Sequence, residues 1–268
     1  MSDILAQYIV ARSEQLLCIT ETLKSDERFV AAWLTGSFGR GEQVDYSDID
    51  IRVIVANAYS ERLCARPWPH GVRITDARLA LFSQFGKPLI IYEAPGNAPE
   101  GGTFTYVLYE HMAMNVDWIL VPQALAKRAA DTRLLFDKVG IPLALPEEPL
   151  PMEERIVTLS NTISFFWMIA ASCIKYLHCH DSLYFNMLLD WLYRAVYEVT
   201  YLLEGKPIPY HKGAHACLAS TQAEQITALR HICERMLELM PKAVEIGAAV
   251  PQAPMSAVET RLAMVAET

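Results

Sequence analysis

The sequence predicts an α+β protein: an N-terminal mixed β-sheet domain with flanking helices, followed by a C-terminal all-α helical bundle. Three observations lead to this fold class. The chain opens with apolar side chains at helical spacing over residues 4–24. Short strand-like runs separated by turn residues then continue to residue 121. After residue 152 the sequence consists almost wholly of long amphipathic helical segments.

The first helix is followed by a short apolar strand over residues 29–34, which ends at Thr35-Gly36-Ser37. Residues 48–55 alternate polar and apolar side chains, which predicts a strand with one half-buried face. The remaining predicted elements are a helix over 74–85, strands over 88–92, 104–109 and 116–121, and helices over 123–130, 153–178, 182–203 and 222–246.

A proline-rich loop separates the two predicted parts and contains Pro142, Pro146, Pro149 and Pro151. Proline clusters between periodic segments indicate loops. We therefore place the domain boundary there, giving an N-terminal domain of residues 1–140 and a helical domain of residues 141–268.

The composition is that of a folded globular protein, with 268 residues of which 52% are hydrophobic and 20% are charged. The formal net charge of −8 argues against a duplex nucleic-acid binder, which normally carries a basic face. The six cysteines form no CxxC pair and are expected to be reduced core thiols. No signal peptide is visible, and the apolar run of residues 163–174 is too short to span a bilayer. We expect a cytoplasmic protein with no nucleic-acid and no membrane partner.

The most informative segment is residues 34–55, which reads LTGSFGRGEQVDYSDIDIRVIV. Alternate residues of a strand point to the same face, so Asp48 and Asp50 share one side of the sheet. Two neighbouring carboxylates repel each other unless a cation lies between them. Mg²⁺ is commonly bound by one or two carboxylates together with substrate phosphates. The pair therefore predicts a magnesium site that also binds phosphate.

The turn before this pair carries features of a phosphate site. Gly36 allows the backbone to approach a ligand closely. Ser37 offers a hydroxyl and an N–H at the start of a short helix, and Arg40 can add positive charge. A Walker-type lysine motif is absent, which argues against a P-loop enzyme.

The order Gly-Ser, glycine, Asp-x-Asp resembles the nucleotidyltransferase superfamily that includes DNA polymerase beta. The stretch Ser25-Asp26-Glu27-Arg28, an apolar strand and Gly-Ser-Phe-Gly-Arg-Gly-Glu is similar to lincosamide and aminoglycoside nucleotidyltransferases. The resemblance implies a catalytic domain over residues 1–140 and a helical domain over 141–268 that covers substrate and nucleotide. It implies ATP or another nucleoside triphosphate as co-substrate, two Mg²⁺ ions and a small hydroxylated acceptor. Antibiotic resistance would be the biological role, and a homodimer is left open.

The resemblance also implies a third carboxylate on a later strand, and Asp117 in the apolar run Met-Asn-Val-Asp-Trp-Ile-Leu-Val matches it. A charge inside an apolar strand is costly unless it is paired or metal-bound. Asp117 would bind metal, act as general base, or do both. Glu110 and Glu93 are rival positions. The resemblance further assigns Lys175 to the triphosphate, with Arg194 and Lys212 as weaker alternatives.

Three functions remain open from the sequence. The first is transfer of AMP to a small molecule with release of pyrophosphate. The second is AMP transfer to a protein by an antitoxin-type nucleotidyltransferase. The third is a catalytically inactive fold used as a binding module, against which the intact Asp48, Asp50 and Asp117 argue.

Overall fold

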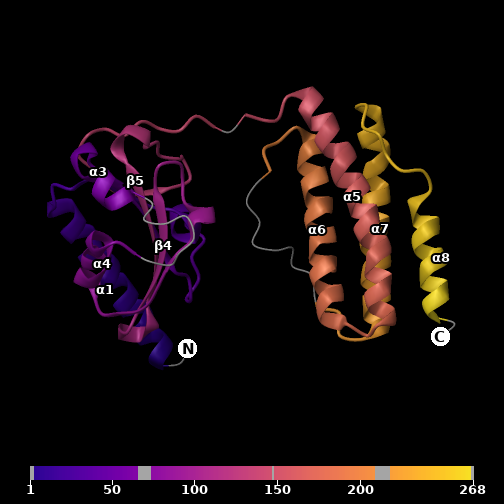
Figure 1. Ribbon diagram of the computed structural model, residues 1–268, viewed down its shortest axis with the longest axis horizontal. Helices are drawn as coiled ribbons and strands as arrows, with labels where there is room; N and C mark the ends of the chain where they lie inside the picture. The colour runs from indigo at the N-terminus through magenta and orange to yellow at the C-terminus, as the bar shows by residue number, and fades with distance from the viewer. Residues whose placement is uncertain (1–2, 66–73, 147, 209–217, 267–268) are drawn as a thin grey trace. The chain divides into compact units, whose positions relative to one another are not determined.

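The computed structural model describes residues 3–65, 74–146, 148–208 and 218–266 and divides into two compact units, Met1–Pro146 and Glu147–Thr268 (Figure 1). The first unit combines a sheet with helices and the second consists of helices, so the predicted α+β class is confirmed. Each unit is described here by itself.

The first unit is built on a six-stranded mixed sheet with the order β3-β4-β5-β2-β1-β6. Its central strands β2 (Ile49–Val55) and β5 (Asn115–Pro122) are parallel. The other neighbours are antiparallel and comprise β1 (Phe29–Leu34), β3 (Pro88–Glu93), β4 (Thr103–Tyr109) and β6 (Arg133–Asp137). A parallel pair at the centre brings the starts of β2 and β5 to the same edge of the sheet.

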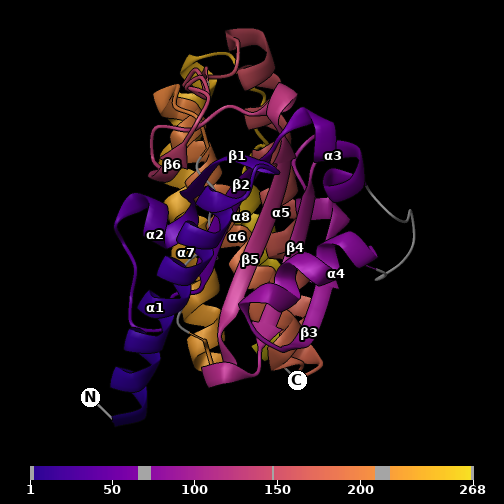
Figure 2. The ribbon, with the colours of Figure 1, turned by 90° about the vertical axis from the view of Figure 1, so that its left-hand side faces the viewer.

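One face of this sheet carries the main core of the unit. Alternate β2 side chains from Ile49 to Val55 pack there with Leu23 of α1 (Asp3–Ser25), Leu63 of α3 (Asn57–Cys64) and Phe82 of α4 (Asp76–Phe82). Figure 2 shows α1 and α4 lying over this face. The intervening β2 side chains, Asp50 and Arg52 among them, therefore point to the opposite face.

The opposite face has a smaller apolar cluster that includes Trp33, Ile54 and Ile119. The residues of this cluster come after Asp50 on β2 and after Asp117 on β5. The first residues of both strands on this face are therefore polar. The alternation predicted for β2 is therefore confirmed: its apolar side chains pack in the core, and its polar side chains Asp50 and Arg52 lie on the opposite face.

One sequence expectation in this unit was wrong, and two elements of the unit, β6 and α3, were not predicted. The helix expected over residues 123–130 is only a 3-10 turn at Gln123–Leu125, followed by a bridge between Arg128 and Leu143. The strand β6 was not predicted, although it pairs with β1 at the sheet edge. The helix propensity of the alanine-rich segment is outweighed by backbone pairing, since the Arg128 N–H donates to the Pro142 carbonyl at 2.9 Å. Helix α3 was also missed.

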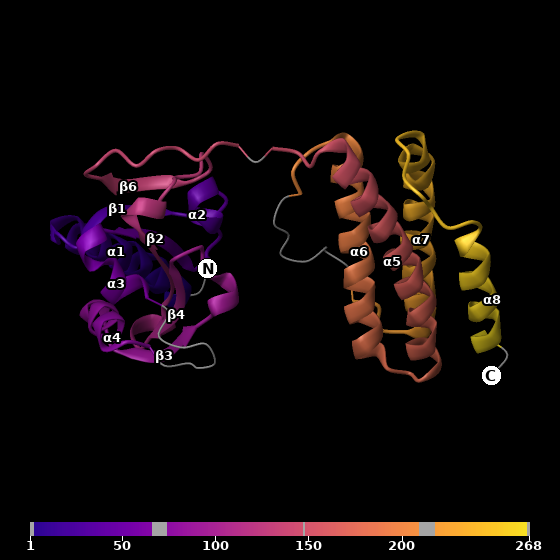
Figure 3. The same ribbon diagram turned by 45° about the horizontal axis from the view of Figure 1, so that its top comes forward.

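The second unit contains α5 (Met152–His178), α6 (Ser182–Glu204), α7 (Gln222–Glu245) and α8 (Pro254–Ala266), which surround one hydrophobic core (Figure 3). Side-chain caps begin two of these helices, α6 and α7. Asp181 accepts a hydrogen bond from the Tyr184 N–H, and Thr221 with Glu224 forms a capping box. Helix α8 was not predicted from the sequence.

Among the described residues, α5 is the one helix long and apolar enough to cross a membrane, with 39% of its most apolar window buried. A single helix of this kind is weak evidence, since the core helix of a bundle passes the same test. The apolar run over residues 163–174 nevertheless belongs to a helix of 27 residues, longer than that run alone suggests. The absence of a membrane partner stays a prediction.

The described cysteines are free thiols, but only three of them are in the core. Cys64, Cys173 and Cys233 are buried, whereas Cys18 and Cys179 are exposed. The expectation of core thiols is therefore wrong for the last two. Cys217 lies outside the described residues.

Candidate active site

The turn between β1 and β2 places Gly36 directly against Asp50. The N–H of Thr35 donates to the backbone carbonyl of Asp50 at 2.9 Å, which fixes the end of β1 beside the start of β2. Gly36 has φ +58°, and a Cβ there would lie 2.0 Å from Oδ2 of Asp50. Only glycine fits both the backbone angle and this close approach. Gly36, predicted to let the backbone approach a ligand, thus lies in contact with the Asp50 carboxylate.

The rest of the turn is the short helix α2 (Gly36–Arg40), which Gly41 ends with φ +73°. Gly41 is in the left-handed conformation, and its N–H donates to the Ser37 carbonyl. A Cβ on Gly41 would meet nothing within 4 Å. Gly36 and Gly41 therefore share a backbone requirement, but only Gly36 touches the acidic residues.

The structure brings Asp48, Asp50 and Asp117 together. Asp50 of β2 lies directly opposite Asp117 of β5 in the parallel pair, and Asp48 precedes β2 on the same face. One carboxylate oxygen from each residue lies within 4.8 Å of the others, and all three side chains are half-buried. Nδ2 of Asn115 donates to Oδ2 of Asp48 at 3.4 Å, a long hydrogen bond that orients the first carboxylate.

Three hard oxygen donors within this distance suit Mg²⁺ or Mn²⁺. The contact of Gly36 with Asp50 supports the fit, because it holds one donor in place without a side chain in the way. The three side chains can thus hold a divalent cation. Which of them bind it, and whether Asp117 also takes a proton, stays a prediction.

The two rivals of Asp117 are engaged elsewhere. Glu93 is buried and receives two hydrogen bonds from the guanidinium of Arg78, at 2.6 and 3.0 Å. Glu110 is exposed and pairs with Lys87 at 2.7 Å. Glu93 neutralises a buried arginine and Glu110 is paired at the surface, whereas Asp117 is the carboxylate grouped with Asp48 and Asp50, so the geometry favours Asp117 over both.

The other predicted nucleotide-binding residues have varied surroundings. Among the described residues, the half-buried Ser37 hydroxyl has no hydrogen-bond partner, so it can donate to a ligand. Arg40 is exposed and pairs with Glu42 at 2.7 Å, which offsets the charge expected for phosphate. Lys175 is an exposed residue of α5 in the second unit, near the ring of Tyr176. Its contact with a triphosphate stays a prediction, and Lys212 lies outside the described residues.

A residue missed by the sequence analysis fixes the loop before Asp48. Arg12 of α1 is only 7% exposed, and its Nη1 donates to the carbonyls of Val44, Asp45 and Ser47, at 3.3, 2.9 and 2.7 Å. The loop thus arrives at Asp48 in one conformation. An arginine between the apolar helix positions of α1 was the available signal, but the carbonyls it binds are more than 30 residues away.

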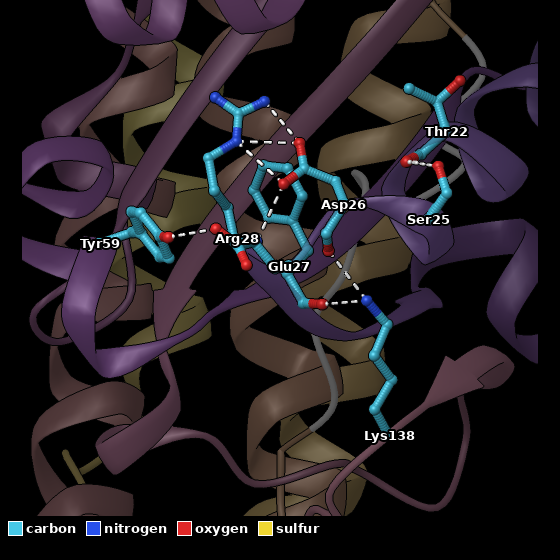
Figure 4. A network of polar contacts seen from close by, with 8 residues as sticks. Thr22, Ser25, Asp26, Glu27, Arg28, Tyr59 and Lys138 are labelled. Atoms are coloured by element: carbon cyan, nitrogen blue, oxygen red, sulfur yellow. Dashed lines mark hydrogen bonds and ion pairs between the residues drawn. The ribbon is translucent and has the colours of Figure 1, made fainter.

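The segment Ser25-Asp26-Glu27-Arg28, which contributed to the resemblance, lies at the far end of β1 from Gly36 and has a structural role (Figure 4). Asp26 accepts hydrogen bonds from the guanidinium of Arg28, and Glu27 accepts one from the Tyr59 hydroxyl at 2.7 Å. Lys138 donates to the carbonyl of Asp26 at 2.8 Å. The network ties β1 to α3 and to the segment after β6, away from the acidic cluster.

Two tyrosines extend the acidic row across the sheet. Tyr106 of β4 lies opposite Asp117, and Tyr92 of β3 lies opposite Tyr106, so these side chains share the face of the carboxylates. Tyr92 is 50% exposed. An aromatic surface next to the acids is suited to a ring-containing ligand, and sequence reasoning did not select it because strand register decides it.

The second unit has a cavity of about 450 Å³ between α5 and α6, lined among others by Phe165, Trp191 and Arg194. The rings of Phe165 and Trp191 lie 6.2 Å apart, and Arg194 is held by Asp190 at 2.8 Å. The structure places them at a cavity of its own within the helical unit.

Residues 19–91 match the family model of the nucleotidyltransferase domain. The match covers β1, α2 and β2, with Gly36, Ser37, Asp48 and Asp50, and confirms the predicted resemblance and enzyme class at the level of the superfamily. No curated protein matches the chain. A solved structure of a STING-associated CdnE c-di-GMP synthase from Capnocytophaga granulosa is 14% identical, with a TM-score of 0.31 over 88% of this chain and 83% of that chain. A likeness of that size carries no argument about function.

Proposed function

We propose that this chain, whose N-terminal unit carries a nucleotidyltransferase domain, transfers AMP from ATP to a hydroxyl group of a small molecule and releases pyrophosphate. The observation that carries the proposal is the cluster of Asp48, Asp50 and Asp117, with one oxygen of each within 4.8 Å of the others. The two tyrosines on the same sheet face support a small acceptor with rings. Aminoglycoside and lincosamide antibiotics are the acceptor classes to test first.

The reaction balances without a further reactant. The acceptor oxygen forms a bond to the α-phosphorus, the bond from that phosphorus to the bridging oxygen breaks, and pyrophosphate leaves. The hydroxyl proton goes to a carboxylate, for which Asp117 is the candidate. Bound Mg²⁺ would neutralise the charge that develops on the phosphate oxygens.

The residues of the chain contribute positioning. Gly36 and the Thr35–Asp50 hydrogen bond hold Asp50, and Arg12 holds the loop that leads to Asp48. Ser37 offers its hydroxyl to a phosphate oxygen. Fixed groups of this kind lower the barrier because little reorganisation is needed during the reaction.

The test is incubation of the protein with ATP labelled at the α-phosphate, Mg²⁺ and a panel of aminoglycosides, lincosamides and other hydroxylated compounds. We expect pyrophosphate release and a labelled small molecule with the wild-type protein. Asp48→Asn and Asp50→Asn should lose this activity by about a thousandfold, since a lost metal ligand removes several kcal/mol of transition-state stabilisation.

The same experiment distinguishes the alternatives. Label that appears on a protein, and not on any small molecule, would identify a protein-modifying enzyme. Nucleotide binding without pyrophosphate release for any acceptor, in the wild type as in Asp50→Asn, would identify a binding module and overturn the proposal.

A further inference from the structure

Arg52 lies on the same face of the sheet as the acidic cluster, two residues after Asp50 on β2. Strand geometry puts their backbones about 7 Å apart, within the reach of an arginine side chain. Arg52 lies between Trp33 of β1 and Ile119 of β5 in one row across the sheet, and Asp50 with Asp117 forms the next row. Arg52 is therefore the next residue after Asp50 on this face, one row further along β2 from the carboxylates.

Arg52 is half-buried, and its side chain differs from those of the buried Arg12 and Arg78 in having no partner among the described residues. In the part of the chain that the structure describes, its Nε is buried without a hydrogen-bond acceptor and no carboxylate forms an ion pair with it. By contrast, Arg12 binds three carbonyls, and Arg78 binds Glu93 and two carbonyls.

A half-buried, unpaired charge weakens a fold, so a purely structural role does not account for Arg52. A guanidinium presents donors in a planar fork that matches the oxygens of a phosphate. Its place beside carboxylates that could hold a divalent cation is where the phosphates of a nucleotide would gather. A cationic group of an acceptor would be repelled at this position.

We propose that Arg52 is a phosphate-binding residue, whose guanidinium binds phosphate oxygens of a ligand seated over Asp48, Asp50 and Asp117. The inference rests on the proposed function, because it takes the ligand to be a nucleotide held at those carboxylates. The phosphate belongs either to the triphosphate of the donor nucleotide or to a phosphorylated acceptor. Both sources offer the same chemistry to the arginine.

The test compares Arg52→Gln and Arg52→Lys with the wild type by isothermal titration calorimetry. Tripolyphosphate with Mg²⁺ probes the donor site, and inorganic phosphate added to protein saturated with Mg-ATP probes an acceptor site. Arg62→Gln is the matched control, since Arg62 is an exposed arginine of α3 and its loss makes the same change in charge.

We expect Arg52→Gln to weaken one of the two phosphate titrations by at least about tenfold, the effect of losing a charge-assisted hydrogen bond. Arg52→Lys should retain part of the affinity, and Arg62→Gln should retain all of it. Weakened tripolyphosphate identifies the donor triphosphate, and weakened inorganic phosphate identifies the acceptor. Thermal unfolding of Arg52→Gln should occur at the wild-type temperature or above it, because no partner is lost.

Unchanged affinity for both probes in Arg52→Gln would overturn the role of Arg52. If ATP binding is still lost in Asp50→Asn, the proposed function survives that result. If the wild-type protein binds neither ATP nor tripolyphosphate, both proposals are wrong. A fall in the unfolding temperature of Arg52→Gln with unchanged affinities would show a structural role instead.

Discussion

The contact between Gly36 and Asp50 allows a sharp test, because the chain contains a matched control. Gly36 and Gly41 both have positive φ, +58° and +73°, which is the range that disfavours a side chain. Alanine in this left-handed region costs about 1–2 kcal/mol at either position. For a unit of this size, that corresponds to a fall in Tm of about 2–4 °C per kcal/mol. Gly36→Ala and Gly41→Ala should therefore share this loss of stability.

The two variants should differ at the acidic cluster. The new Cβ at residue 36 would lie 2.0 Å from Oδ2 of Asp50, whereas real Cβ contacts stay beyond 3.0 Å, so the carboxylate must move by about 1 Å or more. A shift of about 1 Å at a reacting centre can cost about a hundredfold in rate. At Gly41 a Cβ meets nothing within 4 Å, and the cluster should be undisturbed.

The assay is titration of each variant with Mn²⁺, followed by paramagnetic resonance, beside a thermal unfolding curve. We expect Gly36→Ala to lose most of its Mn²⁺ affinity and Gly41→Ala to bind as the wild type does. Equal Mn²⁺ affinities in the two variants would refute the idea that Gly36 positions Asp50.

Four further predictions concern the surroundings of the site. Arg12→Ala should cost about 2–4 kcal/mol in denaturant unfolding, since three carbonyls lose a charged donor, and should weaken Mn²⁺ binding. Glu93→Gln should lower the free energy of unfolding, measured with denaturant, by about 3–5 kcal/mol, and Glu110→Gln should lower it by at most about 1 kcal/mol. Only the first variant breaks a buried ion pair. The pKa of Asp26 is lowered from 3.8 because hydrogen bonds from Arg28 outweigh burial. Its stabilisation should be fully present above pH 3.8 and lost as pH falls through the lowered pKa, so Asp26→Asn should lower the free energy of unfolding at pH 6, and the difference from the wild type should shrink as the pH is lowered through that range. Asp50→Asn should raise the Tm of the metal-free protein.

The sequence predicted the centre of the site because its signals are local. The turn at Gly36 and the alternation through Asp48 and Asp50 lie in one short segment, so strand geometry alone puts the two carboxylates on one face. Asp117 could be found because the family resemblance implies a third carboxylate on a later strand, and a charge inside an apolar strand is costly unless it is paired or metal-bound.

The remaining parts depend on contacts between distant segments. Arg12 acts on carbonyls of residues 44–47, and Arg52 is distinguished only by having no partner, which no sequence pattern reports. The strand β6 is defined by its pairing with the distant strand β1 at the sheet edge, which the local sequence does not report. Tyr92 and Tyr106 join the site through strand register alone.

The expected rise in Tm for Asp50→Asn bears on whether this unit catalyses or only binds. Like charges 4.8 Å apart repel by about 1 kcal/mol at the dielectric constant of water and by about 3 kcal/mol at an effective value of 20. Half-buried carboxylates lie between these limits, so the repulsion among the three carboxylates destabilises the metal-free protein, and a bound cation would offset it. Neutralising Asp50 should raise the Tm by about 2–4 °C or more while Mn²⁺ binding is lost, a gain in stability at the expense of function. In saturating Mn²⁺ the order should reverse, because the cation then stabilises only the wild type. The opposite result would be a lower Tm for Asp50→Asn than for the wild type without metal, with the same change in Tm on adding Mn²⁺ in both proteins. The three carboxylates would then stabilise the fold, and an inactive binding module would be the better account.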